Sequence, residues 1–241
     1  MVHIAVKTLT TLSRGLRTLE ALAAAQPVGL TELAGILGED KSALQRTLAT
    51  LHADGWIAPS PGARAHWELT TRALSMAGGA AASSPLVTRG RPLLGALRDA
   101  TTETAHLALV AAPSLVVVDV AEARQVVRTA LHIGRRLPAD TSAGGRAVCA
   151  ELDAPARGEF TYGSRDLLDP GDYSEIHQRG WAVCEGDVKP GWTSVAGAVR
   201  AADGRPVGAV VVSGPSTRLA PERYPDIGPM VRDVVAELSG A

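Results

Sequence analysis

Residues 31–55 decide how the N-terminal third of this chain folds, and they read TELAGILGEDKSALQRTLATLHADG. Thr31 precedes a short helical segment over residues 32–37, and Gly38 stands where a glycine ends a helix. A second helix begins near Asp40 and runs to Leu51. Two helices that are joined by a tight glycine-containing turn are typical of a helix-turn-helix.

The flanking segments extend this unit to a winged helix-turn-helix over residues 1–72. Downstream, residues 56–58 and 66–69 are short alternating segments around a proline- and glycine-containing turn, which predicts a hairpin with Arg64 at its tip. Upstream, apolar residues recur at intervals of three and four over residues 9–24, as an amphipathic helix requires. These apolar residues are Leu9, Leu12, Leu16, Leu19 and Ala23.

The helix after Asp40 has the polar face that a recognition helix lays into the major groove of DNA. Lys41 and Gln45 are one turn apart, as are Ser42 and Arg46, while the leucines between them face a core. Hydroxyls near helix starts are expected to meet phosphates, and the wing tip to reach the minor groove. The predicted DNA-binding residues are Thr31, Lys41, Ser42, Gln45, Arg46 and Arg64. The alternative is that the cations of this helix only solubilise an exposed face.

Charge predicts that this unit binds DNA as an oligomer. The whole chain of 241 residues has a formal net charge of −1, and residues 1–84 hold seven lysines and arginines against six acidic residues. Phosphate contacts supply most of the non-specific affinity of a protein for DNA. A unit with so little net positive charge is therefore expected to bind paired half-sites as a dimer or higher oligomer. The apolar stripe of the first helix could form the dimer contact, although an intramolecular core would use the same stripe.

Composition excludes several classes of protein. The chain is 46% hydrophobic and 20% charged, which is typical of a globular protein. Its two cysteines, Cys149 and Cys184, have no metal-ligand spacing. The start of the chain lacks a signal-peptide pattern, and no apolar run is long enough to span a membrane. We therefore expect a cytoplasmic protein without metal, cofactor or membrane partner.

Residues 73–85 form a predicted linker, because they are rich in glycine, alanine and serine and end in a proline. Beyond it, residues 86–241 predict an α+β domain with a largely antiparallel sheet. Strands are expected at residues 106–110, 115–120, 126–131, 181–185, 193–200 and 206–213. Residues 135–140 are interpreted as a turn, and helices are expected over 86–101, 144–152, 173–179 and 221–238.

The C-terminal domain contains no convincing catalytic constellation, and a ligand pocket is the better interpretation. The free amides and hydroxyls at the helix start around Ser142 are suited to a carboxylate. Cys184, Ser194 and Ser213 lie on separate predicted strands, where small side chains leave room for a compound, although each could be a small core residue. The main alternative is a hydrolase or transferase that uses the Ser142 or Cys149 region. A second alternative is a scaffold whose helix-turn-helix binds protein alone.

Several stretches resemble the IclR family of transcriptional regulators. They are residues 134–147 (GRRLPADTSAGGRA), 179–191 and 202–223, together with the helix KSALQRTLATL at 41–51. The resemblance runs from about Leu12 to Leu238 in one order. It implies a winged helix-turn-helix, a linker helix and a GAF/PAS-like effector domain, in dimers or tetramers that bind palindromic operators. It further implies a regulator, here expected to be a repressor, whose small-molecule effector changes the spacing of the DNA-binding units.

The resemblance also implies a set of effector-binding positions. The family's small-acid sensors commonly have Asp, Cys, Ser and Ser at four positions that fall here on Cys184, Ser194, Val211 and Ser213. Only the last is retained, so we expect an organic acid or a larger, more apolar effector than glyoxylate or pyruvate. A degenerate pocket that binds nothing is the alternative. The full predicted effector site is His106, Leu137, Ser142, Ala143, Cys184, Ser194, Val211 and Ser213.

Overall fold

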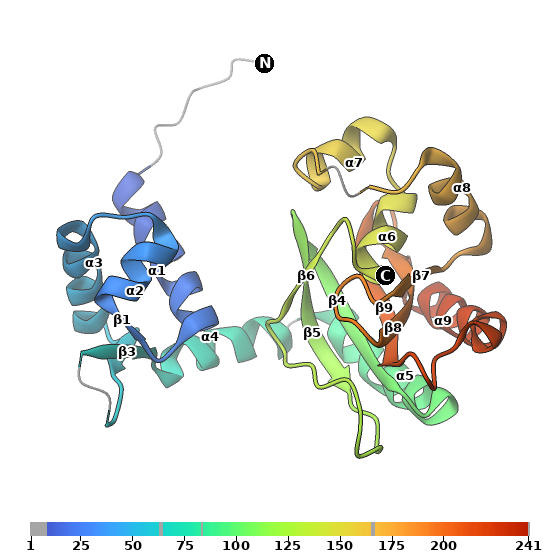
Figure 1. The fold of residues 1–241 in the computed structure, drawn as a ribbon, viewed down its shortest axis with the longest axis horizontal. Coiled ribbons are helices and arrows are strands. Elements are labelled where there is room, and N and C mark those ends of the chain that lie inside the picture. The colour runs from blue at the N-terminus through green and yellow to red at the C-terminus, as the bar shows by residue number, and fades with distance from the viewer. Residues whose placement is uncertain (1–8, 63–64, 83, 165–166, 241) are drawn as a thin grey trace. The chain divides into compact units, whose positions relative to one another are not determined.

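The structure is a computed structural model that describes residues 9–62, 65–82, 84–164 and 167–240. The chain divides into two compact units, residues 1–80 and 81–241. The secondary structure is α+β, as the sequence predicts, with helices and an antiparallel sheet in each unit (Figure 1). No helix within the described part of the chain is long and apolar enough to cross a membrane.

The N-terminal unit packs three helices on a small sheet. The helices are α1 (Thr10–Ala25), α2 (Leu30–Leu37) and α3 (Lys41–Ala53). Strands β1 (Val28–Gly29), β2 (Ile57–Pro59) and β3 (His66–Leu69) form an antiparallel sheet in the order β1-β3-β2. The core is built from apolar residues that are at most 2% exposed, namely Leu22, Val28, Leu33, Leu44, Leu48 and Ile57.

Two local features fix the angle between α2 and α3. Gly38 ends α2 in the left-handed conformation, with φ of 65°, which costs a glycine little. Asp40 caps α3, because its carboxylate accepts hydrogen bonds from the backbone amides of Ser42 and Ala43. The turn of the predicted helix-turn-helix therefore lies between Gly38, which ends α2, and Asp40, which caps α3.

The first part of the apolar stripe of α1 does not face the core of its own unit. Leu9, Leu12 and Leu16 are 71, 60 and 54% exposed, and the buried residues of α1 are Thr18 and Leu22 on the opposite side. The Thr18 hydroxyl is satisfied inside the helix, where it donates to the Arg14 carbonyl. Leu19, further along the stripe, is half-buried and packs against the core, so the exposed part of the stripe is Leu9, Leu12 and Leu16.

Helix α4 (Thr71–Ala82) occupies most of the segment that composition predicted to be a flexible linker. Alanine, leucine and methionine favour a helix strongly enough here to offset the two adjacent glycines. The linker helix that the family resemblance implied is therefore present, and the interpretation of residues 73–85 as flexible was wrong.

The C-terminal unit is a six-stranded antiparallel sheet with helices on both faces (Figure 1). Its strands are β4 (Thr104–Ala111), β5 (Ser114–Ala121), β6 (Arg136–Pro138), β7 (Ala182–Glu185), β8 (Trp192–Arg200) and β9 (Pro206–Pro215), in the order β6-β5-β4-β9-β8-β7. Helices α5 (Pro85–Thr101) and α9 (Tyr224–Leu238) bury one face, with the short 3-10 turn η1 (Pro221–Arg223) before α9. Helices α6 (Ala143–Ala150) and α8 (Pro170–Arg179) bury the other, and α7 (Ala154–Phe160) lies between them in the chain.

Two predictions for this unit were wrong. Residues 126–131, predicted as a strand, lie in an irregular loop, and the edge position beside β5 belongs instead to β6 at residues 136–138, within the predicted turn. The β-branched content of the loop suggested a strand, but Val126 and Val127 are 95 and 61% exposed and have no partner strand. We call residues 122–135 the covering loop. Helix α7 was not predicted.

Gly145 allows α6 to begin close against the end of β6. A Cβ atom at this position would overlap the backbone carbonyl of Ala139, so a residue with a side chain would force the two segments apart. The side chain of Ser142 caps the same helix by accepting a hydrogen bond from the Gly145 amide. This close approach brings the start of α6 to the candidate effector site, which Ser142, Ala143 and Gly144 line.

Candidate functional site

Helix α3 presents the polar face that the sequence predicts. Lys41, Ser42, Gln45 and Arg46 are all exposed, while Leu44, Leu48 and Leu51 are at most 9% exposed and bind the helix to the rest of the unit. The exposed and buried residues follow helical spacing, so one face of α3 packs in the core and the other presents the polar side chains to solvent.

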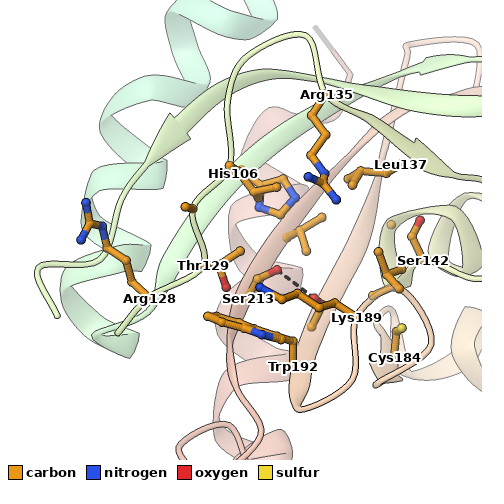
Figure 2. Close-up of a pocket in the computed structure, with 17 residues that line it drawn as sticks. His106, Arg128, Thr129, Arg135, Leu137, Ser142, Cys184, Lys189, Trp192 and Ser213 are labelled. Carbon is orange, nitrogen blue, oxygen red and sulfur yellow. Dashed lines mark hydrogen bonds between the residues drawn. The ribbon is translucent and has the colours of Figure 1, made fainter. Parts of the chain in front are cut away.

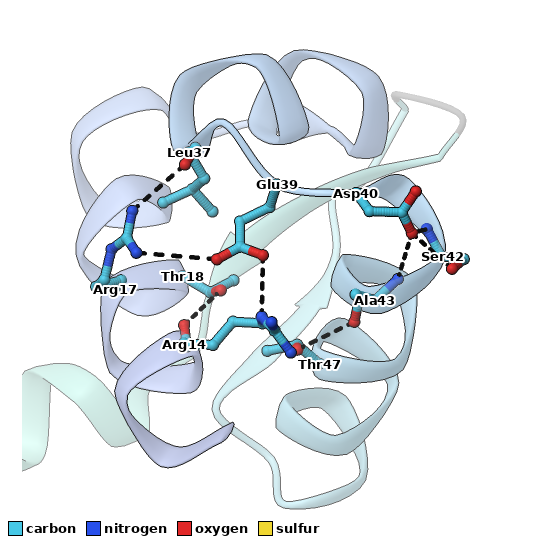
Figure 3. Close-up of polar contacts among 9 residues, drawn as sticks. All are labelled: Arg14, Arg17, Thr18, Leu37, Glu39, Asp40, Ser42, Ala43 and Thr47. Atoms are coloured by element: carbon cyan, nitrogen blue, oxygen red, sulfur yellow. Dashed lines mark hydrogen bonds and ion pairs between the residues drawn. The ribbon is translucent and has the colours of Figure 1, made fainter. Parts of the chain in front are cut away.

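Most cations of the N-terminal unit are already used within the unit. Arg14 and Arg17 lie 3.0 and 3.8 Å from the carboxylate of Glu39 (Figure 3). Arg72 donates to the Asp54 carbonyl at 2.7 Å. Within residues 9–62 and 65–80, Lys41 and Arg46 are the lysine and arginine side chains that have no hydrogen bond or ion pair. Both lie on the exposed face of α3, so this face is where the unit can contact an anion.

The start of α3 is occupied by its own cap, which changes the interpretation of Ser42. The Ser42 hydroxyl donates to the Asp40 carboxylate at 2.6 Å, so its proton is not free for a phosphate (Figure 3). That hydroxyl and the amides of Ala43 and Ser42 hold the pKa of Asp40 below its usual value. The carboxylate is therefore negative and disfavours a phosphate at this helix end, so the predicted phosphate contact from Ser42 competes with the helix cap.

The two remaining predicted contacts lie outside α3. Thr31 is exposed in the first turn of α2, which begins two residues earlier, at Leu30, than the sequence suggested. Its hydroxyl stays available as a candidate phosphate contact near a helix start. Arg64, the predicted wing tip, lies outside the described residues.

A cavity of about 160 Å³ lies in the C-terminal unit at one end of the sheet (Figure 2). All eight residues of the predicted effector site line it: His106, Leu137, Ser142, Ala143, Cys184, Ser194, Val211 and Ser213. The strand register explains how they meet, because Cys184 of β7 lies opposite Ser194 of β8, which lies opposite Ser213 of β9. Small side chains in one row across three strands leave the space that larger residues would fill.

Two residues that line the cavity carry buried, unpartnered polar atoms. His106 is 1% exposed, and neither of its ring nitrogens has a hydrogen-bond partner. Burial lowers the pKa of His106 to about 3, so its ring is neutral near neutral pH. The hydroxyl of Thr129 is also buried and unpartnered, whereas Ser194 and Ser213 bond to each other at 2.8 Å.

The helix start that was expected to receive a carboxylate is partly satisfied by its own cap. The Ser142 hydroxyl donates to the Pro138 carbonyl and accepts from the Gly145 amide. Both cysteines are poor nucleophiles, because burial raises the pKa of the Cys149 thiol to about 11 and that of Cys184 above its usual value. Across the described residues, no group of three metal-ligating side chains gathers in one place.

Nine further residues that line the cavity were missed by the sequence analysis. They are Arg128, Thr129, Ala130, Leu131, Arg135, Gly144, Val188, Lys189 and Trp192. Most belong to the covering loop or to the turn between β7 and β8, whose positions depend on tertiary contacts. The covering loop is held by the Thr104 hydroxyl, which donates to the Thr129 carbonyl at 3.1 Å, and by Arg218, which donates to the Val127 carbonyl at 2.9 Å.

Comparison with known families decides the assignment. Residues 79–240 match the family described as "Bacterial transcriptional regulator IclR C-terminal", and residues 11–61 match the "IclR helix-turn-helix domain". The first match alone covers more than half of the chain. The chain belongs to the IclR family. The resemblance that was read from the sequence is thereby confirmed.

Two characterised relatives align with nearly the whole IclR-family chain. The acetate operon repressor of Salmonella typhimurium is 26% identical over 95% of this chain and 88% of its own length. The HTH-type transcriptional regulator BhcR of Paracoccus denitrificans is 29% identical over 95% of this chain and 85% of its own length. The family and these relatives are transcriptional regulators and not enzymes, which is contrary to the hydrolase or transferase alternative.

Solved structures share the fold. A transcriptional regulator from Alicyclobacillus acidocaldarius superposes with a TM-score of 0.82 at 21% identity, over 97% of this chain and 98% of that one. HmgR of Pseudomonas aeruginosa has a TM-score of 0.57 at 26% identity, over 96% of this chain and 97% of that one. Together with the family matches, these findings make the chain a ligand-responsive DNA-binding transcriptional regulator.

Proposed function

We propose that this IclR-family protein represses transcription from a palindromic operator, and that an organic acid bound in the C-terminal unit alters its affinity for that operator. Repression is supported by similarity to the acetate operon repressor and to the transcriptional repressor IclR of Escherichia coli. Because the proposed operator is chromosomal DNA, we propose that the protein works in the cytoplasm.

The observation that carries the proposal is the exposed face of α3. The side chains of Lys41 and Arg46 form no hydrogen bond or ion pair with a described residue, and Gln45 lies between them on the same face. An arginine or lysine that reaches a guanine, and a glutamine that reaches an adenine, are common base contacts in the major groove. We assign Lys41, Gln45 and Arg46 to base and phosphate contacts, and Thr31 and Arg64 to additional backbone contacts.

The exposed stripe of α1 is proposed to contact a second copy of this chain. Leu9, Leu12 and Leu16 follow the three- and four-residue spacing of a helix-pairing seam, and all three are exposed. A single unit with two free cations on α3 has few phosphate contacts, so pairing of two units on adjacent half-sites increases affinity. The working species is therefore proposed to be a dimer or a dimer of dimers.

Thermodynamic linkage between effector binding and DNA binding explains how an effector would act without a chemical reaction. If the effector prefers one arrangement of the C-terminal units, it changes the spacing of the paired α3 helices and hence the affinity for the operator. A coupling free energy of roughly 1–3 kcal/mol alters affinity about 5–150-fold. Val211, Leu131 and Val188 make the cavity partly apolar, which supports an effector with more apolar surface than glyoxylate or pyruvate.

A footprint on the intergenic DNA upstream of the gene tests this proposal. Wild-type protein is expected to protect two related half-sites whose centres lie about one or two helical turns of DNA apart, because a two-fold symmetric dimer presents two α3 helices. Leu16→Glu, which adds a charge to the stripe, is expected to protect the same DNA only at a concentration at least about tenfold higher. Thr11→Glu, which adds the same charge to α1 away from the stripe, is the matched control.

Two outcomes would contradict the proposal. A footprint of a single, unpaired site would exclude the palindromic operator. Equal footprints from wild type, Leu16→Glu and Thr11→Glu would exclude the α1 stripe as the contact between copies.

A further inference from the structure

We propose that Glu39 is a positioning residue for operator recognition, because it ties helix α1 to the turn before α3 and so fixes the half-site spacing that a dimer reads. This inference rests on the proposed function, in which α1 pairs two copies of the chain and α3 contacts DNA. Glu39 itself belongs to neither contact. It acts through Arg14 of α1 and through the start of α3.

Two arginines of α1, about one helical turn apart, hold the Glu39 carboxylate. Arg14 Nε lies 3.0 Å from Glu39 Oε2, and Arg17 Nη1 lies 3.8 Å from Glu39 Oε1 (Figure 3). Arg17 also donates to the Leu37 carbonyl at 3.3 Å. The side chains of Arg14 and Glu39 are 28 and 18% exposed, so salt screens the shorter pair less than a pair on the open surface. We call these contacts of Glu39 with Arg14 and Arg17 the Glu39 link.

Glu39 is the residue of the turn whose side chain reaches α1. Gly38, which ends α2, has no side chain, and the Asp40 carboxylate accepts from the first amides of α3. Helix α3 begins at Lys41, two residues after Glu39. A carboxylate that is fixed against α1 therefore fixes the point from which α3 extends.

Helix α1 carries the Glu39 link and the proposed pairing surface on different faces. Arg14 continues at intervals of four residues to Thr18 and Leu22, which are both 0% exposed. Leu12 and Leu16 are 60 and 54% exposed and belong to the stripe that is proposed to contact a second copy. When two α1 helices pair, the Glu39 link of each copy therefore holds its turn at a defined distance from the other.

A small change in the angle of α3 is enough to alter the spacing that a dimer reads. Leu44 and Leu48 hold the middle of α3 in the core, whereas the Glu39 link restrains its start. The 13 residues of α3 span about 20 Å, so a tilt of about 10° around the middle moves each end by about 2 Å. Two copies together change the separation by roughly 3.5 Å, which is close to the rise of about 3.4 Å for one base pair.

Binding of the full-length protein to duplexes of different half-site spacing tests the inference. One duplex carries the footprinted operator, the other carries it with one base pair inserted at its centre, and fluorescence anisotropy measures both affinities. Wild-type protein is expected to prefer the native spacing at least about tenfold. Glu39→Gln keeps the size of the side chain and removes its charge. It is expected to reduce this preference at least about threefold, because the pair is lost in both copies.

Two readouts separate positioning from a loss of stability. The melting temperature of Glu39→Gln is expected to fall by less than about 5 °C, because the pair is partly exposed. Its affinity for a duplex with a single half-site is expected to equal that of Glu20→Gln, which removes the same charge from an exposed position of α1. Glu20→Gln is expected to keep the wild-type spacing preference. A Glu39→Gln protein that loses single-site affinity as well would show a merely structural role and overturn the inference.

Arg14→Gln breaks the Glu39 link from the side of α1, which keeps the inference testable if Glu39→Gln fails to fold. It is expected to reduce the spacing preference, and the double variant is expected to be no worse than Glu39→Gln alone, because both changes remove one interaction. Arg14→Lys, which keeps the charge, is expected to retain most of the preference. Additive losses in the double variant would show that the two residues act separately and would overturn the inference.

Failure of the inference and failure of the proposed function give different results. Equal spacing preferences in wild type, Glu39→Gln and Arg14→Gln would refute the inference alone. A wild-type protein that protects paired half-sites but binds both duplexes equally would also refute the inference alone. A wild-type protein that protects no paired half-sites would refute the proposed function.

Discussion

Arg46→Ala is expected to reduce affinity for the operator by at least about thirtyfold while leaving the fold unchanged. Each bidentate contact between an arginine and a base contributes about 1–3 kcal/mol, and a two-fold symmetric complex loses it at both half-sites. The side chain is exposed and has no hydrogen bond or ion pair within the unit, so its removal disturbs no described contact. Operator affinity is measured by fluorescence anisotropy at fixed salt, and folding by circular dichroism.

Two further variants test whether the loss of operator affinity is specific to the position and the geometry of Arg46. Arg205→Ala removes the same charge from a turn of the C-terminal unit, where the side chain is 71% exposed, and is expected to bind the operator as wild type does. Arg46→Lys keeps the charge but loses the bidentate geometry, so it is expected to retain non-specific binding and lose selectivity. Unchanged operator affinity in Arg46→Ala would contradict the assignment of α3 as the DNA-binding helix.

Arg218→Ala is expected to destabilise the C-terminal unit by about 3–5 kcal/mol, which lowers its melting temperature by roughly 6–20 °C. The guanidinium of Arg218 forms two hydrogen bonds with Glu103, at 2.6 and 2.7 Å, and the Glu103 side chain is 0% exposed. Alanine leaves that carboxylate buried without a partner. Arg218 also donates to the Val127 carbonyl, so its loss is expected to loosen the covering loop and to weaken effector binding.

The matched control for this prediction is an exposed pair in the same unit. Arg232 and Asp233 lie 3.3 Å apart and are 55 and 72% exposed, so Arg232→Ala is expected to cost less than about 1 kcal/mol. The double variant Glu103→Gln with Arg218→Met, which removes both charges, is expected to recover much of the lost stability. Equal melting temperatures for Arg218→Ala and Arg232→Ala would show that the buried carboxylate finds another partner.

The features that local patterns predicted well are those that local forces determine. The start of α3 at Lys41, the stop at Gly38 and the buried leucines of α3 follow from capping, backbone freedom and helical period. The long strands β4, β5, β8 and β9 follow from alternation and β-branched content over eight to ten residues. Tertiary contacts are not needed to recognise any of these.

The features that were missed depend on contacts between distant parts of the chain. Residues 126–131 have the composition of a strand, but the edge beside β5 is filled by β6, and Arg218 and Thr104 hold the loop instead. Arg135 and Lys189 therefore line the cavity from segments that sequence patterns could not bring together. The exposure of Leu12 and Leu16 was left open because periodicity identifies an apolar face without showing what covers it.

The proposed function depends on the reading of a specific DNA sequence by α3. Its most direct test is the affinity of wild-type protein, across a range of salt concentrations, for its own upstream intergenic DNA and for a scrambled duplex of the same composition. We predict that near physiological salt the affinity for the upstream DNA is at least about a thousandfold higher than the affinity for the scrambled duplex. As the salt concentration rises, both affinities are expected to fall, and their ratio is expected to fall less steeply than either affinity. Equal affinity for the two duplexes at every salt concentration would contradict the claim.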